Sequence, residues 1–327
     1  MKRLLWLFPG VAVSVALALP AWILGRLVPI VGAPIFAIVA GMVLSFFGRP
    51  SVLEGGIGFA GKKILQYSII FLGFGLDLGI VLKVGLESLA VMVFTLSAAF
   101  LTAYLAGKAL KIDSKVKILV GVGTAICGGS AIAATAPVID ADEEEVAYSI
   151  STIFLFNIIA VFLFPALGHI MGMTQQAFGL WSGTAINDTS SVVAAAFSYG
   201  DDAGRYATVV KLTRTLMIIP VTLVLAFALW RRSEGGRGRL DLAKIVPWFV
   251  LGFLATSLAR TLGVLPVPFA STLPEIGKFG ICVAMAAIGL RSNPLKLVRN
   301  GVRPILLGLA CWISVAVVSL IVQWPRV

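Results

Sequence analysis

Long apolar stretches separated by short polar connections run along the whole chain. Each stretch is near the roughly 20 residues that an α-helix needs to cross a hydrocarbon core of about 30 Å. The pattern therefore predicts an all-α membrane protein with about 9–11 transmembrane segments. The predicted segments are 4–24, 30–47, 64–82, 88–108, 115–140, 146–171, 174–199, 204–230, 245–262, 271–290 and 302–322.

The composition agrees with a membrane protein and excludes a soluble one. Hydrophobic residues make up 59% of the 327 positions and charged residues 13%, too little charge to cover a soluble surface. The N-terminal Lys2-Arg3 and the apolar run to Leu24 leave a signal peptide as the alternative reading. We expect a first transmembrane helix instead, because the run is long and further membrane segments follow.

The distribution of basic residues predicts the orientation. With the N-terminus inside and alternating sides, 18 of the 26 Lys and Arg residues fall inside and six outside, while Lys211 and Arg214 lie within a helix. Cytoplasmic loops of membrane proteins carry such an excess. We therefore expect a multi-pass protein of the bacterial inner membrane with a cytoplasmic N-terminus. This accounts for the net charge of +11 without a nucleic-acid partner.

The chain reads as one integral membrane transporter domain, 1–327. The longest polar stretch, 231–244, is predicted to be a cytoplasmic linker and is too short for a soluble module. The acidic run 140–145 is expected to be a solvated connection between helices, with attraction of ions as the alternative.

An internal repeat relates two segments rich in small and polar residues. Residues 123–136 and 183–196, aligned without gaps at a distance of 60, agree at seven of fourteen positions. A fainter echo relates Gly61-Lys62 to Gly277-Lys278. We therefore expect repeat-like halves, about 1–140 and 174–322, of the kind that pack as inverted copies in secondary transporters.

Both repeated segments are predicted to contain broken helices. Gly128-Gly129 weakens the helix by roughly 1 kcal/mol per residue. Unwound backbone cannot face lipid, so it must line a protein cavity, where helix N-termini attract anions and carbonyls coordinate cations. Tight helix packing through small residues is the alternative. The segments either cross the membrane fully or form re-entrant hairpins that enter from opposite sides, and charge counting cannot decide between the two.

Asp188 is the sharpest candidate for a functional residue, because a carboxylate near mid-membrane costs about 2.5–3.5 kcal/mol. A structural helix cap is its alternative role. Lys211 and Arg214 share one helical face and are expected to neutralise Asp188, hold an anionic substrate or snorkel to the interface. The predicted substrate- and ion-binding residues are Thr124, Cys127, Gly128, Gly129, Ser130, Asn187, Asp188, Thr189, Ser190, Ser191, Lys211 and Arg214.

From about Lys62 to Val224 the chain resembles the bacterial membrane-protein family labelled sulfate exporters and long catalogued as conserved hypothetical. The likeness rests on the strings GTAICGGSAIAATAPVI, LFNIIAVFLFPALG, GLWSGTAINDTSSVVAA and VVKLTRTLMIIP, in this order. Many members carry His-Glu where this chain has Asn187-Asp188, so a mechanism that needs the histidine is not supported. The family is similar to cation/proton antiporters and bile-acid symporters, which implies a substrate-carrying core that moves against a scaffold.

Three functions are in competition. The first is an ion-coupled transporter of a small anion of the sulfate, sulfite or organosulfonate class, held between the breaks at 123–130 and 183–191, with Na⁺ or H⁺ as coupling ion. The second is a Na⁺/H⁺-type antiporter, and the third a non-transporting membrane protein. We expect no enzyme, because no Ser-His or paired-Asp arrangement lies at suitable depth. We also expect no metal and no other cofactor. The sequence leaves the oligomeric state open, a homodimer included.

Overall fold

The structure is a computed structural model that describes residues 2–28, 31–48, 50–221, 224, 248–264, 266–292 and 302–324, and these residues form helices and short connections without a strand. The predicted linker 231–244 lies outside the described residues. The elements are α1 (Lys2–Leu27), α2 (Ala33–Ser45), η1 (Ser51–Leu53), α3 (Glu54–Phe59), the π-helical turn η2 (Ala60–Ile64), α4 (Leu65–Gly73), α5 (Leu78–Ala109), α6 (Ser114–Ala125), α7 (Gly129–Thr135), α8 (Glu143–Ile170), α9 (Gln175–Ala185), α10 (Thr189–Tyr199), α11 (Asp201–Leu216), α14 (Trp248–Thr261), α15 (Val267–Arg291) and α17 (Val302–Gln323).

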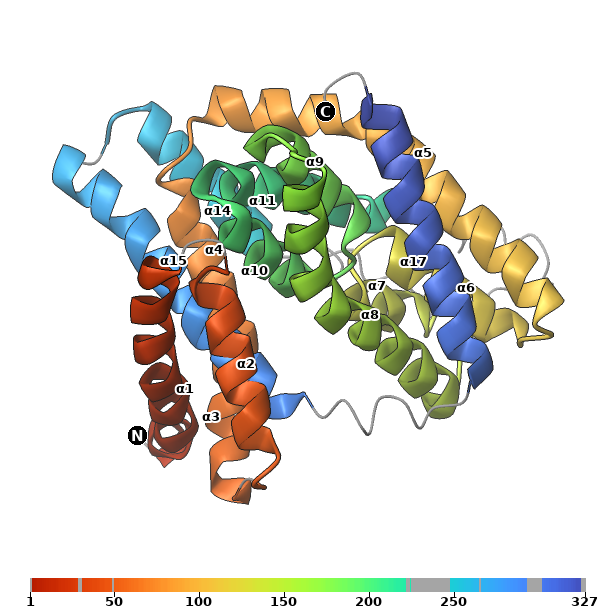
Figure 1. The fold of residues 1–327 in the computed structure, drawn as a ribbon, viewed down its shortest axis with the longest axis horizontal. Helices are drawn as coiled ribbons and strands as arrows, with labels where there is room; N and C mark the ends of the chain where they lie inside the picture. Colours follow the sequence, from red (N-terminus) through yellow and green to blue (C-terminus); the bar gives the residue numbers. More distant parts are fainter. Residues whose placement is uncertain are drawn as a thin grey trace.

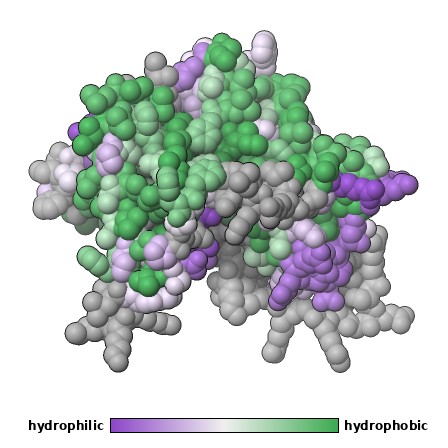
Figure 2. Space-filling model, turned by 60° about the horizontal axis from the view of Figure 1, so that its bottom comes forward, coloured by the Kyte–Doolittle hydropathy of each residue, from purple (hydrophilic) through white to green (hydrophobic). Residues whose placement is uncertain are grey.

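The length and surface of the helices confirm an all-α membrane protein. Five described helical stretches are long and apolar enough to cross a membrane: Trp6–Leu27, Leu78–Ala109, Glu143–Ile170, Ser271–Arg291 and Val302–Gln323. Large apolar side chains stand on the outside, for example Phe47 and Ile170, which are about four-fifths exposed. Apolar residues cover much of the face in Figure 2, and hydrophilic residues gather toward one lower edge. Such a surface suits lipid and not water.

The helices form two bundles. In one, which we call the scaffold bundle, α15 packs on α1, α2 and α4, and α14 packs on α4. In the other, which we call the core bundle, α5–α11 pack on one another and on α17. In Figure 1 the helices α1, α2 and α15 lie to the left, and α6 and α17 to the right. Between the bundles, α10 packs on α2 and α15, and α14 packs on α5.

Inside the scaffold bundle, the two segments of the fainter sequence echo pack against each other in opposite directions. A Cβ atom on Gly61 would lie 3.3 Å from the Ile288 side chain, and one on Gly277 would lie 2.8 Å from the Ser68 carbonyl oxygen. The lower-numbered segment therefore runs antiparallel to the higher-numbered one, as expected of inverted copies.

Two predicted segments, 64–82 and 88–108, have wrong boundaries. Helical residues run from Glu54 to Gly73 and then from Leu78 to Ala109. The first helix begins early because its glycines allow close packing: a Cβ atom on Gly56 would lie 2.1 Å from the Leu7 carbonyl oxygen of α1. The second begins at Leu78 because the Asp77 carboxylate accepts a hydrogen bond from the Gly79 N–H at 2.7 Å and so caps the helix.

The segment 114–140 is a re-entrant hairpin, which we call hairpin 1. Its arms are α6 and α7, and its two ends lie side by side, because the Lys115 Nζ atom donates to the Asp140 carbonyl oxygen at 2.6 Å. The acidic run that follows starts α8 with a capping box, in which Asp142 and Glu145 exchange hydrogen bonds.

The segment 175–200 is a second such hairpin, hairpin 2. Its arms are α9 and α10, and the Gln175 side-chain oxygen at its start accepts hydrogen bonds from the N–H groups of Asp202 and Ala203 just after its end. Helix α8 joins the end of hairpin 1 to the start of hairpin 2 and is about 42 Å long at 1.5 Å per residue. The hairpins therefore enter the molecule from opposite ends, which decides the alternative that the sequence left open.

The breaks fall at matching positions of the sequence repeat. Helices α6 and α9 end at Ala125 and Ala185, and α7 and α10 begin at Gly129 and Thr189. The turn of hairpin 1 passes through Gly128, whose φ of 69° and ψ of −127° are accessible to glycine but strained for other residues.

We predict that Gly128→Ala lowers the free energy of unfolding by about 1–3 kcal/mol, chiefly through backbone strain. A Cβ atom there would lie 3.3 Å from the Ile153 Cγ2 atom, a tight contact that needs only a small shift of that side chain. Gly129→Ala is the matched control, because Gly129 is helical and its Cβ atom would meet only Phe154 at 3.6 Å. Thermal unfolding in detergent measures both variants. Equal midpoints would contradict the strained turn.

Candidate functional site

The tips of the two hairpins meet beside the middle of α8. A Cβ atom on Gly128 would lie 3.8 Å from the Asp188 Cβ atom and 3.7 Å from the Asn157 Nδ2 atom. Asn157 is the fifteenth of the 28 residues of α8, and its side-chain oxygen accepts a hydrogen bond from the Asp188 N–H at 3.2 Å. The non-helical residues of both breaks thus lie together beside Asn157, about halfway along α8, the helix that joins the bases of the two hairpins.

The carbonyl ends of α6 and α9 are held by Arg214 of α11. Its guanidinium donates to the carbonyl oxygens of Ala125 at 2.7 Å, Ile186 at 3.1 Å and Thr124. The side chain is completely buried. Helix C-termini leave carbonyls without partners and carry a partial negative charge, so a buried cation there satisfies both demands.

Lys211, one turn earlier on α11, binds the same two breaks. Its Nζ atom donates to the carbonyl oxygens of Ile126 at 2.8 Å, Ile186 at 3.0 Å and Asn187, and it too is completely buried. The three acceptors match the three N–H donors of an ammonium group. The basic pair is therefore engaged with backbone, a role that the sequence analysis did not consider.

Asp188 lies at the N-terminus of α10, where the helix carries a partial positive charge. Its carboxylate accepts a hydrogen bond from the Ser190 N–H at 2.9 Å and another from the Ser190 hydroxyl, and the residue is half-buried. No ion pair joins Asp188 to Lys211 or Arg214, all three of which are described. Asp188 thus has the structural role of a helix cap and remains partly accessible.

Three buried polar side chains at the tips lack hydrogen-bond partners within the described structure. They are the Thr124 hydroxyl, the Asn157 amide nitrogen and both amide atoms of Asn187. Each residue is at most 2% exposed. Buried polar groups in proteins are nearly always paired with protein, water or ligand. Three such groups at one place mark the tips as the strongest candidate for a binding site.

The other predicted site residues divide by exposure. Cys127 and Gly128 are buried in the turn of hairpin 1, and Ser190 and Ser191 are nearly buried in the first turn of α10. Gly129 and Thr189 are half-buried, and Ser130 is exposed. The structure therefore gathers the predicted residues around one junction, with its accessible side at the start of α7 and α10.

Asn157 and the carbonyl groups were not among the residues predicted from the sequence. A single amide in the middle of the apolar helix α8, within LFNII, is a signal that could have found Asn157, because polar residues at membrane depth are expensive. The carbonyl groups of Ala125, Ile126 and Ile186 carry no sequence signal, since every residue has one.

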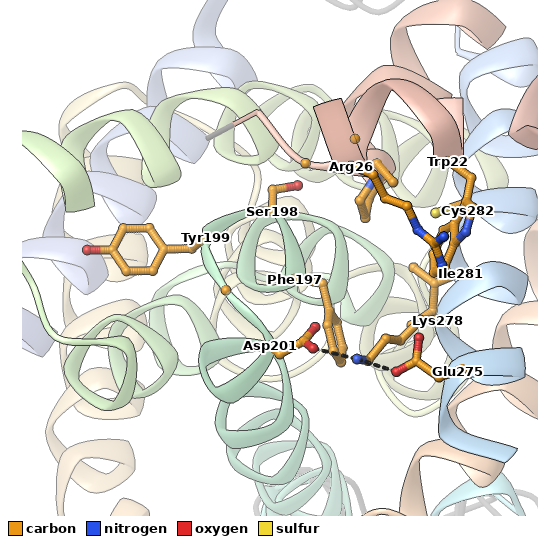
Figure 3. Close-up of a pocket in the computed structure, with 15 residues that line it drawn as sticks. Trp22, Arg26, Phe197, Ser198, Tyr199, Asp201, Glu275, Lys278, Ile281 and Cys282 are labelled. Atoms are coloured by element: carbon orange, nitrogen blue, oxygen red, sulfur yellow. Dashed lines mark hydrogen bonds and ion pairs between the residues drawn. The ribbon is translucent and has the colours of Figure 1, made fainter. Parts of the chain in front are cut away.

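A cavity of about 340 Å³ lies between the bundles at the far end of α10. Figure 3 shows Lys278 of α15 between two carboxylates, with Arg26, Trp22 and Cys282 nearby. The Lys278 Nζ atom lies 2.6 Å from the Asp201 carboxylate of the core bundle and 2.7 Å from that of Glu275. The Arg26 guanidinium stands over the Trp22 ring at 5.3 Å.

Long apolar helices, two opposed hairpins and buried charges at their tips define a polytopic α-helical membrane protein. A family model described as conserved hypothetical protein 698 matches residues 9–308. UPF0324 membrane proteins of Streptococcus mutans, Streptococcus pyogenes serotype M18 and Fusobacterium nucleatum are 47%, 48% and 43% identical to this chain, over 96% of each protein. The chain belongs to this family of membrane proteins, which confirms the family resemblance.

We predict that Arg214→Leu lowers the free energy of unfolding by about 3–5 kcal/mol, because it leaves the buried carbonyls of Thr124 and Ala125 without their charged donor. Arg205→Leu on the same helix is the control: its side chain is 37% exposed and lies 4.0 Å from Asp202, so less than about 1 kcal/mol should be lost. Denaturation in detergent measures both. A small loss for Arg214→Leu would mean that these hydrogen bonds are dispensable.

Proposed function

We propose that this protein is an ion-coupled secondary transporter of a small anion of the sulfate, sulfite or organosulfonate class. The observation that carries the proposal is the junction of the two hairpin tips, where unpaired buried side chains accompany a surplus of positive charge. Opposed broken helices that meet at mid-depth are characteristic of secondary transporters.

The charges at the junction favour an anion over a cation. Two buried cations, Lys211 and Arg214, face one carboxylate, Asp188. Helices α6 and α9 end there while α7 and α10 begin there, so their partial charges of about half a unit each cancel to first order. About one positive charge remains, and in a low-dielectric interior such a charge needs a counter-ion. The amide nitrogens of Asn157 and Asn187 and the Thr124 hydroxyl are donors suited to anionic oxygens.

Asp188 supplies the coupling in this proposal. Its carboxylate is half-buried and close to the unpaired side chains, and protonation would add one positive charge to the junction. An anion then binds more favourably when the carboxyl is protonated, and by thermodynamic linkage the proton binds more favourably when the anion is present. Proton and anion would therefore travel in the same direction.

The two-bundle architecture supplies a moving part. Within each bundle the helices pack extensively, whereas α10 on α2 and α15 and α14 on α5 are the main contacts between them. We propose that the core bundle carries the junction past the scaffold bundle, with the cavity beside Lys278 at one end of the sliding surface. The excess of basic residues on the predicted inner side supports a bacterial inner-membrane location with a cytoplasmic N-terminus.

Flux measurements on purified protein in liposomes test this function. Labelled sulfate or taurine should move under an imposed pH gradient, and Asp188→Asn should abolish the dependence on that gradient. Asp202→Asn is the matched control, because Asp202 is 72% exposed at the surface of the same bundle and should transport like the parent.

No flux of any such anion, together with an Asp188→Asn variant that behaves like the parent, would refute the proposal. Cation/proton exchange in vesicles that contain chloride as the only anion would favour the antiporter instead.

Cross-linking tests the movement between bundles. Asp201 of the core bundle and Glu275 of α15 both contact the Lys278 Nζ atom, and their side chains are 60% and 53% exposed, so a short bifunctional thiol reagent across Asp201→Cys and Glu275→Cys should stop transport. A cleavable linker should restore it after reduction. Each single cysteine variant should remain active under the same treatment. Full activity of the cross-linked protein would exclude sliding at this surface.

A further inference from the structure

Lys211 sits in a ligand sphere that resembles a cation-binding site. Its ammonium nitrogen is bound by three backbone carbonyl oxygens, those of Ile126 from hairpin 1 and of Ile186 and Asn187 from hairpin 2. All three N–H donors are used, and the side chain has no solvent exposure. The group is therefore not free to bind a substrate directly.

The surrounding carbonyls are accounted for as well. Arg214 takes the carbonyl oxygens of Thr124 and Ala125 and shares that of Ile186. Unwound carbonyls and half-helix C-termini are the groups that coordinate alkali cations in broken-helix membrane proteins. Here the position offered by both hairpin tips is filled by an ammonium group that is covalently attached to α11.

We propose that Lys211 is a built-in replacement for a coupling alkali cation: its ammonium group fills a monovalent-cation site made by the carbonyls of both tips. Sodium then has no place at the junction, and the protonation of Asp188 is left as the coupling step. This last consequence rests on the proposed transport function, whereas the occupancy of the cation site does not.

If Lys211 occupies a cation site, removing its ammonium group should leave a site that a free cation can bind. Methionine follows the lysine side chain as far as its Cε atom, so Lys211→Met removes the ammonium nitrogen. The carbonyl oxygens of Ile126 and Asn187 then lose this donor, and that of Ile186 keeps only Arg214. A small free cation such as sodium, ammonium or methylammonium should enter that space and restore the lost interactions. The wild-type protein should not respond, because its own ammonium group occupies the site.

Thermal unfolding in detergent tests this, with choline, potassium, sodium, ammonium and methylammonium chlorides at constant ionic strength. We expect the wild-type midpoint to be the same in all five salts. The Lys211→Met midpoint should be low in choline and rise with a saturable dependence on sodium, ammonium or methylammonium. Lys117→Met, which removes a half-buried lysine at the base of hairpin 1, should behave like the wild type.

Two results would overturn the proposal. One is a salt response of Lys211→Met that does not differ from that of the wild type. The other is saturable stabilisation of the wild type by sodium that disappears in Asp188→Asn, since sodium would then bind at the carboxylate. If Lys211→Met does not fold, the wild-type titration decides alone: a sodium-independent midpoint supports the proposal and a sodium-dependent one refutes it. None of these readouts requires transport, so a failure of the proposed function would be seen separately in the flux measurements.

Discussion

The structure depends on how the carbonyl ends of two half-helices are satisfied in the middle of an apolar protein. Helices α6 and α9 stop at Ala125 and Ala185, where neither water nor a continuing helix can supply hydrogen-bond donors. Lys211 and Arg214 supply six donated hydrogen bonds to these ends from one face of α11. The position of α11, the meeting of the hairpin tips and the presence of two buried cations all follow from this requirement.

The junction has two sides: one is formed by the carbonyl ends of α6 and α9, and the other by the amide ends of α7 and α10. The carbonyl side is closed, because every donor of Lys211 has a backbone acceptor and both basic side chains are completely buried. The amide side is different: Asp188 caps α10 but remains half-buried, and the unpaired groups of Thr124, Asn157 and Asn187 lie at the tips. The anion binding that we propose depends on this arrangement, in which fixed buried cations lie next to a partly accessible polar surface.

The positions of the two helix breaks could be predicted from the sequence, because small and polar residues weaken a helix at the place where they occur. The 60-residue offset predicted matching breaks, and the helix ends match at that offset. Asn187-Asp188 marked the second tip because a carboxylate in an apolar run is costly.

The choice between crossing segments and hairpins could not be predicted from the sequence, since it depends on contacts such as that of Lys115 with Asp140, which join distant positions. The partners of Lys211 were equally hidden, because backbone carbonyls 85 residues away leave no mark in the sequence. The early start of the helix at Glu54 was not predicted, because glycines in a sequence indicate a flexible connection. Here they allow close packing, which becomes apparent only once α1 is in place.

Labelling of introduced cysteines from the two sides of the membrane tests the opposed hairpins most directly. Single cysteines at the exposed positions Ser114 and Glu143 flank hairpin 1, and cysteines at Gln176 and Asp202 mark the base of hairpin 2. With a membrane-impermeant maleimide in oriented vesicles, we expect the first pair to be labelled from one side and the second pair from the other. Labelling of Ser114→Cys and Glu143→Cys from opposite sides would show that 114–140 crosses the membrane, and the junction of two re-entrant tips would then be wrong.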